Sequence, residues 1–324
     1  MYGARHLCIG GYMDKYKYIV PETRRVRVIV DTDCKNEADD QFAVAHFLMT
    51  PRFDIRGVVA AHFGKNERYL PRLNVEASYD EIIKVMDLME IPGKYPVVMG
   101  APHAMPDEVT PVDSSGARLI VEEAMKDDDK PLFVCLLGPI TDLASAYLLE
   151  PKIAGRVTGI WIGGGSYPTG GGEFNCGNDI NAVNALFASD MQIWQVPRAT
   201  YKQMNISLAE LQTRVRPCGD IGKYLFEQMV EFNIEKGKTP GRWPQGETWG
   251  LGDQAAVTLL LEDYASQNFD WVPAPRVHPD GIYEHGQPNR PIRVYHTLDT
   301  RMTMEDFYAK LLINYTPEFL KGFI

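Results

Sequence analysis

Residues 26–40 read VRVIVDTDCKNEADD. The first five of them are β-branched except for Arg27, which is typical of a strand buried in a sheet. Residues 39–50 then carry apolar side chains at helical spacing, and Pro51 ends that pattern. The acidic segment from Asp31 to Asp40 is therefore predicted to lie between the carboxyl end of a strand and the start of a helix.

The same alternation of strands and helices continues along the chain. Further strands are predicted at residues 55–61, 95–99, 131–137, 157–162 and 193–196, and helices at residues 75–89, 115–125, 141–149, 181–187, 221–235, 253–261 and 304–313. This pattern predicts an α/β fold with a mostly parallel central sheet flanked by helices. Residues 239–252 are predicted to form a long loop that leads to Asp253, and the Pro- and Gly-rich residues 273–291 to cover a sheet edge.

Length and composition indicate an ordinary globular enzyme. The chain has 324 residues, of which 45% are hydrophobic and 23% charged, and we expect one α/β domain over residues 1–324 with residues 1–24 as an N-terminal extension. The formal net charge of −10 argues against nucleic acid as a partner. No apolar run reaches the roughly 18 residues of a membrane span, the N-terminus lacks a secretory pattern, and the five cysteines form no C-x-x-C pair. These features predict a cytoplasmic protein.

The acidic segment places five carboxylates within ten residues, directly after an apolar strand. Carboxylates held so close repel and raise one another's pKa, so a positive charge is expected among them. Oxygen ligands of this kind favour Ca²⁺, Mg²⁺ or Mn²⁺ over zinc. The alternative is a solvated acidic loop in which Asp39 and Asp40 only cap the following helix.

The ordered motifs of the chain resemble those of the nucleoside hydrolase (N-ribohydrolase) family, which is inosine-uridine preferring in its best-known members. The resemblance rests on Asp31-x-Asp33 followed by the pair Asp39-Asp40, and on later markers in the same order. These markers are Gly64-x-Asn66, Leu137-Gly138-Pro139-Ile140-Thr141-Asp142, Gly163-Gly164, Glu173-Phe174-Asn175, Asp179 and Asp253. Together they span about two thirds of the chain and imply a Rossmann-like open sheet with the family's arrangement.

The resemblance implies a metal-dependent hydrolase of N-glycosidic bonds. Its cation, Ca²⁺ with Mg²⁺ as the alternative, would be held by Asp33, Asp40, Asp253 and the backbone carbonyl of Leu137. Asp33 would be the general base that activates a metal-bound water for attack at the anomeric carbon. The sugar hydroxyls would be bound by Asp39, Asn66, Glu173 and Asn175. The family also implies a nucleoside or glycoside as the small-molecule substrate, and assembly as a homodimer or homotetramer.

Two departures from the family pattern concern the same site. Asn36 and Glu37 are extra residues between the second Asp and the Asp-Asp pair, and Gly252 stands where family members carry a His that acts near the leaving group. We therefore considered other residues that could bind or activate the leaving group: His62, Trp243 and Trp249 first, and Tyr201 and Lys202 as weaker candidates. Each of these has a structural alternative, in which the side chain simply packs or completes a hydrogen-bond network.

Two other functions fit parts of the sequence. The first is a sugar- or nucleoside-binding homologue that has lost catalysis, which Gly252 in place of a His favours. The second is a phosphatase of the haloacid dehalogenase type, which would use the apolar strand that ends in Asp31-Thr32-Asp33. The second function leaves Asp39-Asp40 and Glu173-Phe174-Asn175 without a role, and Lys35 stands where that class expects a Thr.

Overall fold

The computed structural model of the protein describes residues 15–64, 74–238, 246–261, 268–316 and 320. Its centre is an eight-stranded sheet with the order β3-β2-β1-β4-β5-β6-β12-β9. The first six strands in the chain are those that the sequence predicts, with small differences at their ends. Their bounds are β1 Val26–Thr32, β2 Phe53–Ala60, β3 Val97–Met99, β4 Leu132–Leu136, β5 Val157–Ile162 and β6 Gln192–Val196. They pair in parallel throughout, so the predicted α/β class is confirmed.

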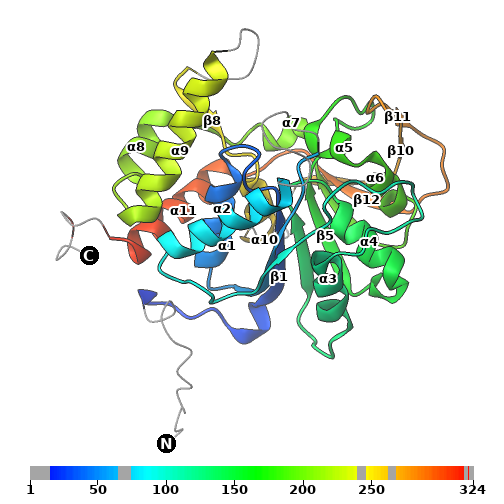
Figure 1. The fold of residues 1–324 in the computed structure, drawn as a ribbon, viewed down its shortest axis with the longest axis horizontal. Helices are drawn as coiled ribbons and strands as arrows, with labels where there is room; N and C mark the ends of the chain where they lie inside the picture. The colour runs from blue at the N-terminus through cyan, green and yellow to red at the C-terminus, as the bar shows by residue number, and fades with distance from the viewer. Residues whose placement is uncertain (1–14, 65–73, 239–245, 262–267, 317–319, 321–324) are drawn as a thin grey trace, which may run out of the picture.

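Helices cover both faces of this sheet because successive side chains of each strand point to opposite faces (Figure 1). Val28 and Val30 of β1 belong to the apolar core on one face, and Ile29 belongs to the core on the other. The first face carries α1 Asp40–Met49, α2 Asn74–Leu88, α9 Gly219–Gly237, α10 Gln254–Leu261 and α11 Thr300–Asn314. The second face carries α3 Ser115–Met125, α4 Thr141–Leu149 and α6 Ile180–Phe187.

Helix α1 is buried along its whole length, from Asp40 to Met49. It packs against α2, α10 and α11 as well as against β1, which explains why its sequence has no clear polar face. The helix ends at Met49, one residue earlier than predicted, and the extended C-cap residue Thr50 precedes Pro51. Because its first residue is also part of the acidic segment, the position of α1 in the core determines where Asp39 and Asp40 lie.

The predicted helix at residues 304–313 is confirmed as part of α11, but the strands between residues 269 and 295 were not predicted. Strand β12 (Pro291–Tyr295) extends the sheet in parallel beside β6, and β9 (Phe269–Pro273) adds an antiparallel edge. Between them lie the short paired strands β10 Arg276–Val277 and β11 Tyr283–Glu284, where the sequence suggests only an irregular cover. Strands this short depend on a partner distant in sequence, so periodicity alone does not reveal them.

The predicted loop at residues 239–252 is also partly wrong. Residues 239–245 lie outside the described part of the chain, but Thr248–Gly250 forms β8, which pairs antiparallel with β7 Asn205–Ser207. The remaining helices are short: α5 Phe174–Asn178, α7 Arg198–Tyr201, α8 Leu208–Arg214, and the 3-10 helices Glu22–Arg24 and Pro151–Ile153. No helix in the described residues combines the length and apolar character needed to cross a bilayer.

The strand order places the acidic segment at the switch point of the sheet, where new strands stop being added on one side of β1 and begin to be added on the other. The sheet grows from β1 toward β3 on one side and from β4 toward β6 on the other, so β1 and β4 flank the crevice where open α/β sheets bind ligands. Asp31 and Thr32 end β1, while Leu137 follows β4 and Gly163 follows β5. The fold thus brings the carboxyl ends of three neighbouring strands to one place.

Replacing Ile29 with Ala should lower the free energy of unfolding by about 2 to 5 kcal/mol, because the side chain is fully buried and its loss leaves a cavity under the central strand. Denaturant titration followed by circular dichroism measures this change. Ile19→Ala is the matched control, since Ile19 is 88% exposed and its truncation should change stability by less than about 0.5 kcal/mol. Equal effects of the two substitutions would contradict the assigned core.

Candidate active site

The loop between β1 and α1 is held on both sides by hydrogen bonds. The Thr32 hydroxyl donates to the Asp40 carboxylate, which ties the end of the strand to the first residue of the helix. Gln41 donates from Nε2 to the Cys34 carbonyl at 2.7 Å, and Lys35 binds Glu81 of α2 at 2.8 Å. Asn36 and Glu37, which the resemblance marks as additions to the family pattern, thus lie in a loop that is anchored to α1 and α2.

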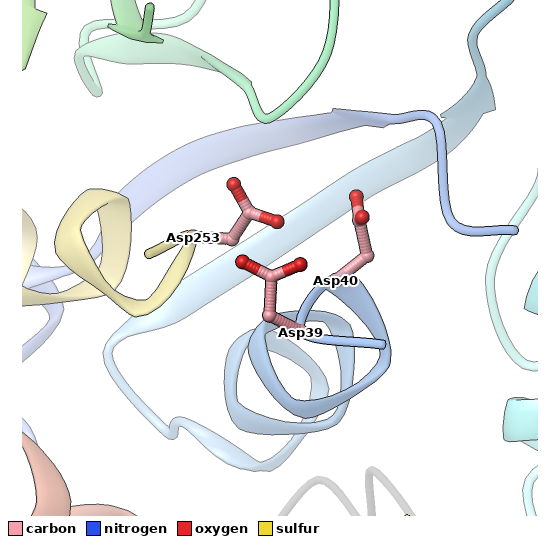
Figure 2. Close-up of side chains that lie close together, drawn as sticks. All are labelled: Asp39, Asp40 and Asp253. Atoms are coloured by element: carbon pink, nitrogen blue, oxygen red, sulfur yellow. The ribbon is translucent and has the colours of Figure 1, made fainter. Parts of the chain in front are cut away.

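Three carboxylates from distant parts of the chain meet beside this loop. Asp39 and Asp40 stand at the start of α1, and Asp253 comes from the segment just before α10 (Figure 2). Each offers an oxygen, and these oxygens all lie within 4.8 Å of one another. Backbone N–H groups of Gly252 and Asp253 donate to Asp39, which joins the two segments directly. Within the described residues this is the cluster that could hold a metal ion.

Burial and mutual repulsion strongly perturb these carboxylates. Burial raises the pKa of Asp39 to about 6, and burial together with the neighbouring Asp39 raises the pKa of Asp40 to about 8. For the same two reasons the pKa values of Asp33, Glu37 and Asp253 lie well above the ordinary range of a carboxyl group. Without a counter-charge, the ionised cluster is therefore electrostatically unfavourable.

Asp33 lies beside the three carboxylates, and its surroundings fit a hard cation. Its side chain is 2% exposed, and Oδ2 has no hydrogen-bond partner among the described residues. A Cβ at Gly138 would come within 3.0 Å of the Asp33 carboxyl carbon, so the glycine after β4 makes room for this side chain. An unpaired buried carboxylate oxygen among several other carboxylates is the donor set that Ca²⁺ and Mg²⁺ prefer.

Glu173 and Asn175 lie on the other side of the crevice, after β5. Glu173 caps α5 by accepting from the N–H groups of Asn175 at 3.2 Å and Cys176 at 2.9 Å, and it also accepts from Gly164 N–H at 2.8 Å. Asn175 donates from Nδ2 to the carbonyls of Leu137 at 2.7 Å and Ile162 at 2.8 Å. The Leu137 carbonyl, which the family resemblance assigns to the metal, therefore has Asn175 as a hydrogen-bond partner in this structure.

Comparison with known proteins identifies the family. The inosine-uridine preferring nucleoside hydrolase family matches residues 28–307. The chain belongs to this family. Membership places it among the hydrolases that act on N-glycosyl compounds, and the family resemblance seen in the sequence is confirmed.

Sequence relatives of this nucleoside hydrolase family member are distant. It is 29% identical over 170 residues to an inosine-uridine preferring nucleoside hydrolase from Leishmania major, and the match covers 51% of this chain and about half (52%) of the relative. It is 24% identical over 232 residues to a probable uridine nucleosidase 2 from Arabidopsis thaliana, covering 62% of this chain and 68% of that protein.

The solved structures extend the likeness to nearly the whole fold. A purine-preferring ribonucleoside hydrolase from Gardnerella vaginalis superposes with a TM-score of 0.73 at 17% identity, covering 89% of this chain and 99% of that one. An inosine-guanosine nucleoside hydrolase gives a TM-score of 0.69 at 15% identity, covering 90% and 99%. At these identities the structures support the fold alone, so the expected Rossmann-like arrangement is confirmed independently of the site.

His62 has a structural environment in this family member. It is 1% exposed, its Nδ1 accepts from Gly64 N–H at 3.2 Å, and its Nε2 lies 2.8 Å from the Thr141 hydroxyl, which donates to Asp179 at 2.7 Å. Burial lowers the pKa of His62 to about 4, so the ring is neutral near pH 7. Both ring nitrogens are satisfied within the protein, which favours the structural alternative over a role at the leaving group.

Trp249 lies in β8 with no exposed surface, and its ring packs edge-on against Phe232 of α9 at a centroid distance of 5.9 Å. This packing favours the structural alternative for Trp249 over stacking on a nucleobase. Asn66 and Trp243 lie outside the described residues.

Two features of the site were missed from the sequence. Phe174 is 49% exposed although it stands between the buried residues Glu173 and Asn175. Asp39, which the resemblance assigns to the sugar, is one of the three clustered carboxylates, whereas Asp33 lies beside them. The helical start at Asp40 is the signal that explains this arrangement, because consecutive residues at a helix start share one end of the helix.

In EDTA, where the protein is free of metal, replacing Asp40 with Asn should raise the free energy of unfolding at about pH 8 by about 1 to 3 kcal/mol relative to wild type. The pKa of Asp40 is raised from 3.8 to about 8 by folding. The folded state therefore binds this proton more tightly, and the associated stability is complete below the unfolded pKa and lost as the pH rises through the folded pKa. Denaturant titrations in EDTA at about pH 5 and about pH 8 measure the difference.

The stabilisation by Asp40→Asn should shrink at the lower pH, where wild-type Asp40 is protonated in the folded state. Added Ca²⁺ should stabilise wild type more than the variant, since the cation supplies the missing positive charge. A difference between the two proteins that does not depend on pH would contradict the assignment.

Proposed function

We propose that the protein is a divalent-cation-dependent nucleoside N-ribohydrolase. The observation that carries this proposal is the convergence of Asp39, Asp40 and Asp253 at the switch point of the sheet, in a chain that belongs to the nucleoside hydrolase family. Asp33 adds a buried carboxylate oxygen without a partner among the described residues. A merely solvated acidic loop would leave these side chains exposed, whereas each of the four is at most 8% exposed.

The resident cation in this proposal is Ca²⁺, with Mg²⁺ as the alternative. Asp33, Asp40 and Asp253 would hold it together with the Leu137 carbonyl, as the family resemblance implies, and Asp39 is close enough to contribute. The donor set consists of oxygen atoms only, which suits a hard cation. Four neighbouring carboxylates favour the larger Ca²⁺, because it accepts more oxygen ligands in a less regular geometry than Mg²⁺.

The proposed reaction replaces the C–N bond at the anomeric carbon of a nucleoside with a C–O bond from water. A bound divalent cation would lower the pKa of a water molecule toward neutral pH. Asp33 would take a proton from the attacking water as general base. The surrounding carboxylates would stabilise the positive charge that develops on the sugar ring. The electrons of the broken C–N bond leave with the nucleobase, which takes up a proton from solvent, and ribose forms without a covalent enzyme intermediate.

The sugar would be bound between the carboxylate cluster and the β5 side of the crevice. Asp39, Glu173 and Asn175 are the described residues we assign to the ribose hydroxyls, and Asn66 remains assigned by resemblance alone. Carboxylate and amide groups form strong directional hydrogen bonds with hydroxyl groups. The relatives carry names that include inosine, uridine, purine and pyrimidine, so the substrate class we propose is the ribonucleoside, with the base left to experiment.

The haloacid dehalogenase alternative is disfavoured by the same geometry. Such a phosphatase would use Asp31 as its nucleophile, but Asp31 is fully buried and is not one of the three clustered carboxylates. Burial and the neighbouring Asp142 also raise the pKa of Asp31 well above its ordinary value. The binding-only alternative is motivated by Gly252, and turnover measurements distinguish it.

We further propose a homodimer or homotetramer in the cytoplasm, which light scattering and cell fractionation would test.

The purified protein with Ca²⁺ should release ribose from members of a panel of purine and pyrimidine ribonucleosides, as measured by a reducing-sugar assay. Dialysis against EDTA should abolish the release because the carboxylate cluster then lacks its counter-charge, and Ca²⁺ should restore it. Calorimetric binding of a nucleoside without sugar release over hours would instead support the binding-only homologue. Metal-dependent phosphate release blocked by Asp31→Asn would support the phosphatase.

Asp33→Asn should lower kcat for ribose release by about 10² to 10⁴ because the amide cannot accept a proton from water. Steady-state kinetics at saturating Ca²⁺ measure this loss, and calorimetry of Ca²⁺ binding separates it from loss of the cation. Asp87→Asn is the matched control, since Asp87 is an exposed aspartate near the end of α2. Unchanged kcat in Asp33→Asn would remove Asp33 from the role of base.

A further inference from the structure

Tyr201 reaches into the crevice from a rigid position. It is the last residue of α7, which follows β6, and its N–H donates to the Pro197 carbonyl at 3.1 Å. The preceding residue, Thr200, donates from its buried hydroxyl to the Tyr295 carbonyl of β12 at 2.6 Å. These contacts fix the backbone of α7 to the sheet, so the fold determines the point from which the Tyr201 side chain extends.

The Tyr201 hydroxyl donates to Glu173 Oε1 at 3.0 Å. Glu173 has three other donors, the N–H groups of Gly164, Asn175 and Cys176, and all three belong to the backbone. Oε1 accepts from Tyr201 and Asn175, and Oε2 accepts from Gly164 and Cys176. Tyr201 is thus the one side-chain donor among them, and it holds the carboxylate from across the crevice.

The ring of Tyr201 fills the space beside Gly252. A Cβ at position 252 would come within 3.0 Å of Tyr201 Cδ2 and within 3.5 Å of Asp39 Oδ2. A side chain at this position would make a tight contact with the tyrosine ring, which would have to shift by a few tenths of an ångström. Glycine at position 252 therefore leaves the ring of Tyr201 in its present place.

We propose that Tyr201 is a positioning residue for Glu173, and that Tyr201 and Gly252 form a matched pair that spans the crevice from Glu173 to the carboxylate cluster at Asp39. The inference rests on the proposed function, because it assigns Glu173 to the ribose. Burial and the nearby Glu173 raise the pKa of Tyr201 far above its ordinary value. The hydroxyl therefore stays protonated and donates to Glu173 throughout the neutral pH range.

The test is Tyr201→Phe, which keeps the ring and removes only the hydroxyl. KM for ribonucleosides should rise by about tenfold, since a hydrogen bond to a charged group is lost, while kcat should change by less than about threefold. KM should be measured for a series of 2′-, 3′- and 5′-deoxynucleosides. The rise in KM caused by Tyr201→Phe should be absent for the one member that lacks the hydroxyl bound by Glu173. A residue with only a structural role would not distinguish between these sugars.

Gly252→Ala should produce the same rise in KM in the wild-type background, because the new methyl group displaces the ring. In the Tyr201→Phe background it should add little, since the contact between hydroxyl and carboxylate is already lost. Tyr315→Phe is the matched control. Tyr315 is the C-cap of α11, and its hydroxyl donates to the Met89 carbonyl at 2.8 Å. Removal of this hydroxyl should leave KM unchanged.

A KM unchanged for every ribonucleoside in Tyr201→Phe, or an equal penalty for all the deoxynucleosides, would overturn the inference. Failure of the proposed function would look different, because wild type itself would then release no sugar. Crystal structures of wild type and Tyr201→Phe decide the question in that case. We expect the Glu173 carboxylate to turn in the variant, and an unchanged orientation would overturn the positioning role without reference to activity.

Discussion

Buried carboxylates that repel one another are the constraint around which this site is arranged. Asp39, Asp40 and Asp253 bring oxygens within 4.8 Å of one another, and Asp33 lies beside them, in a place from which water is largely excluded. The protein holds them with neutral donors: the Thr32 hydroxyl on Asp40 and backbone N–H groups on Asp39. Neutral donors orient the carboxylates but do not cancel their charge, which a divalent cation would do.

The parallel sheet explains how residues so far apart reach this place. Strands β1, β4 and β5 lie side by side in parallel, so their carboxyl ends meet at the same edge of the sheet. The acidic loop, Gly138 and the capping residue Glu173 follow these three strands in turn. Asp253 does not follow one of these strands. The short β7–β8 pair and the Leu251 N–H, which donates to the Met204 carbonyl at 2.7 Å, hold the segment that precedes it. Activity would therefore depend on segments that share no local sequence signal.

The contacts of a polar or aromatic residue, rather than its type, indicate whether it belongs to the candidate site or only to the fold. The sequence suggests His62 and Trp249 as candidate site residues. In the structure, His62 completes a hydrogen-bond chain through Thr141 to Asp179, and Trp249 packs on Phe232. Tyr201 carries a weaker sequence signal, yet its hydroxyl contacts Glu173 and its ring contacts Gly252. Residue type indicates what a side chain is able to do, and only its neighbours decide whether it does so.

The sequence by itself determined the fold class, the six parallel strands from β1 to β6 and the acidic segment as the centre of the site, because the alternation of apolar runs and the density of carboxylates are local signals. Tertiary structure alone decided the strands β7 to β12, which need distant partners to form. It also decided that Asp39 joins the clustered carboxylates and that Tyr201 occupies the space next to Gly252. Those arrangements depend on distances between segments about 50 to 200 residues apart, and no pattern within a single segment encodes such distances.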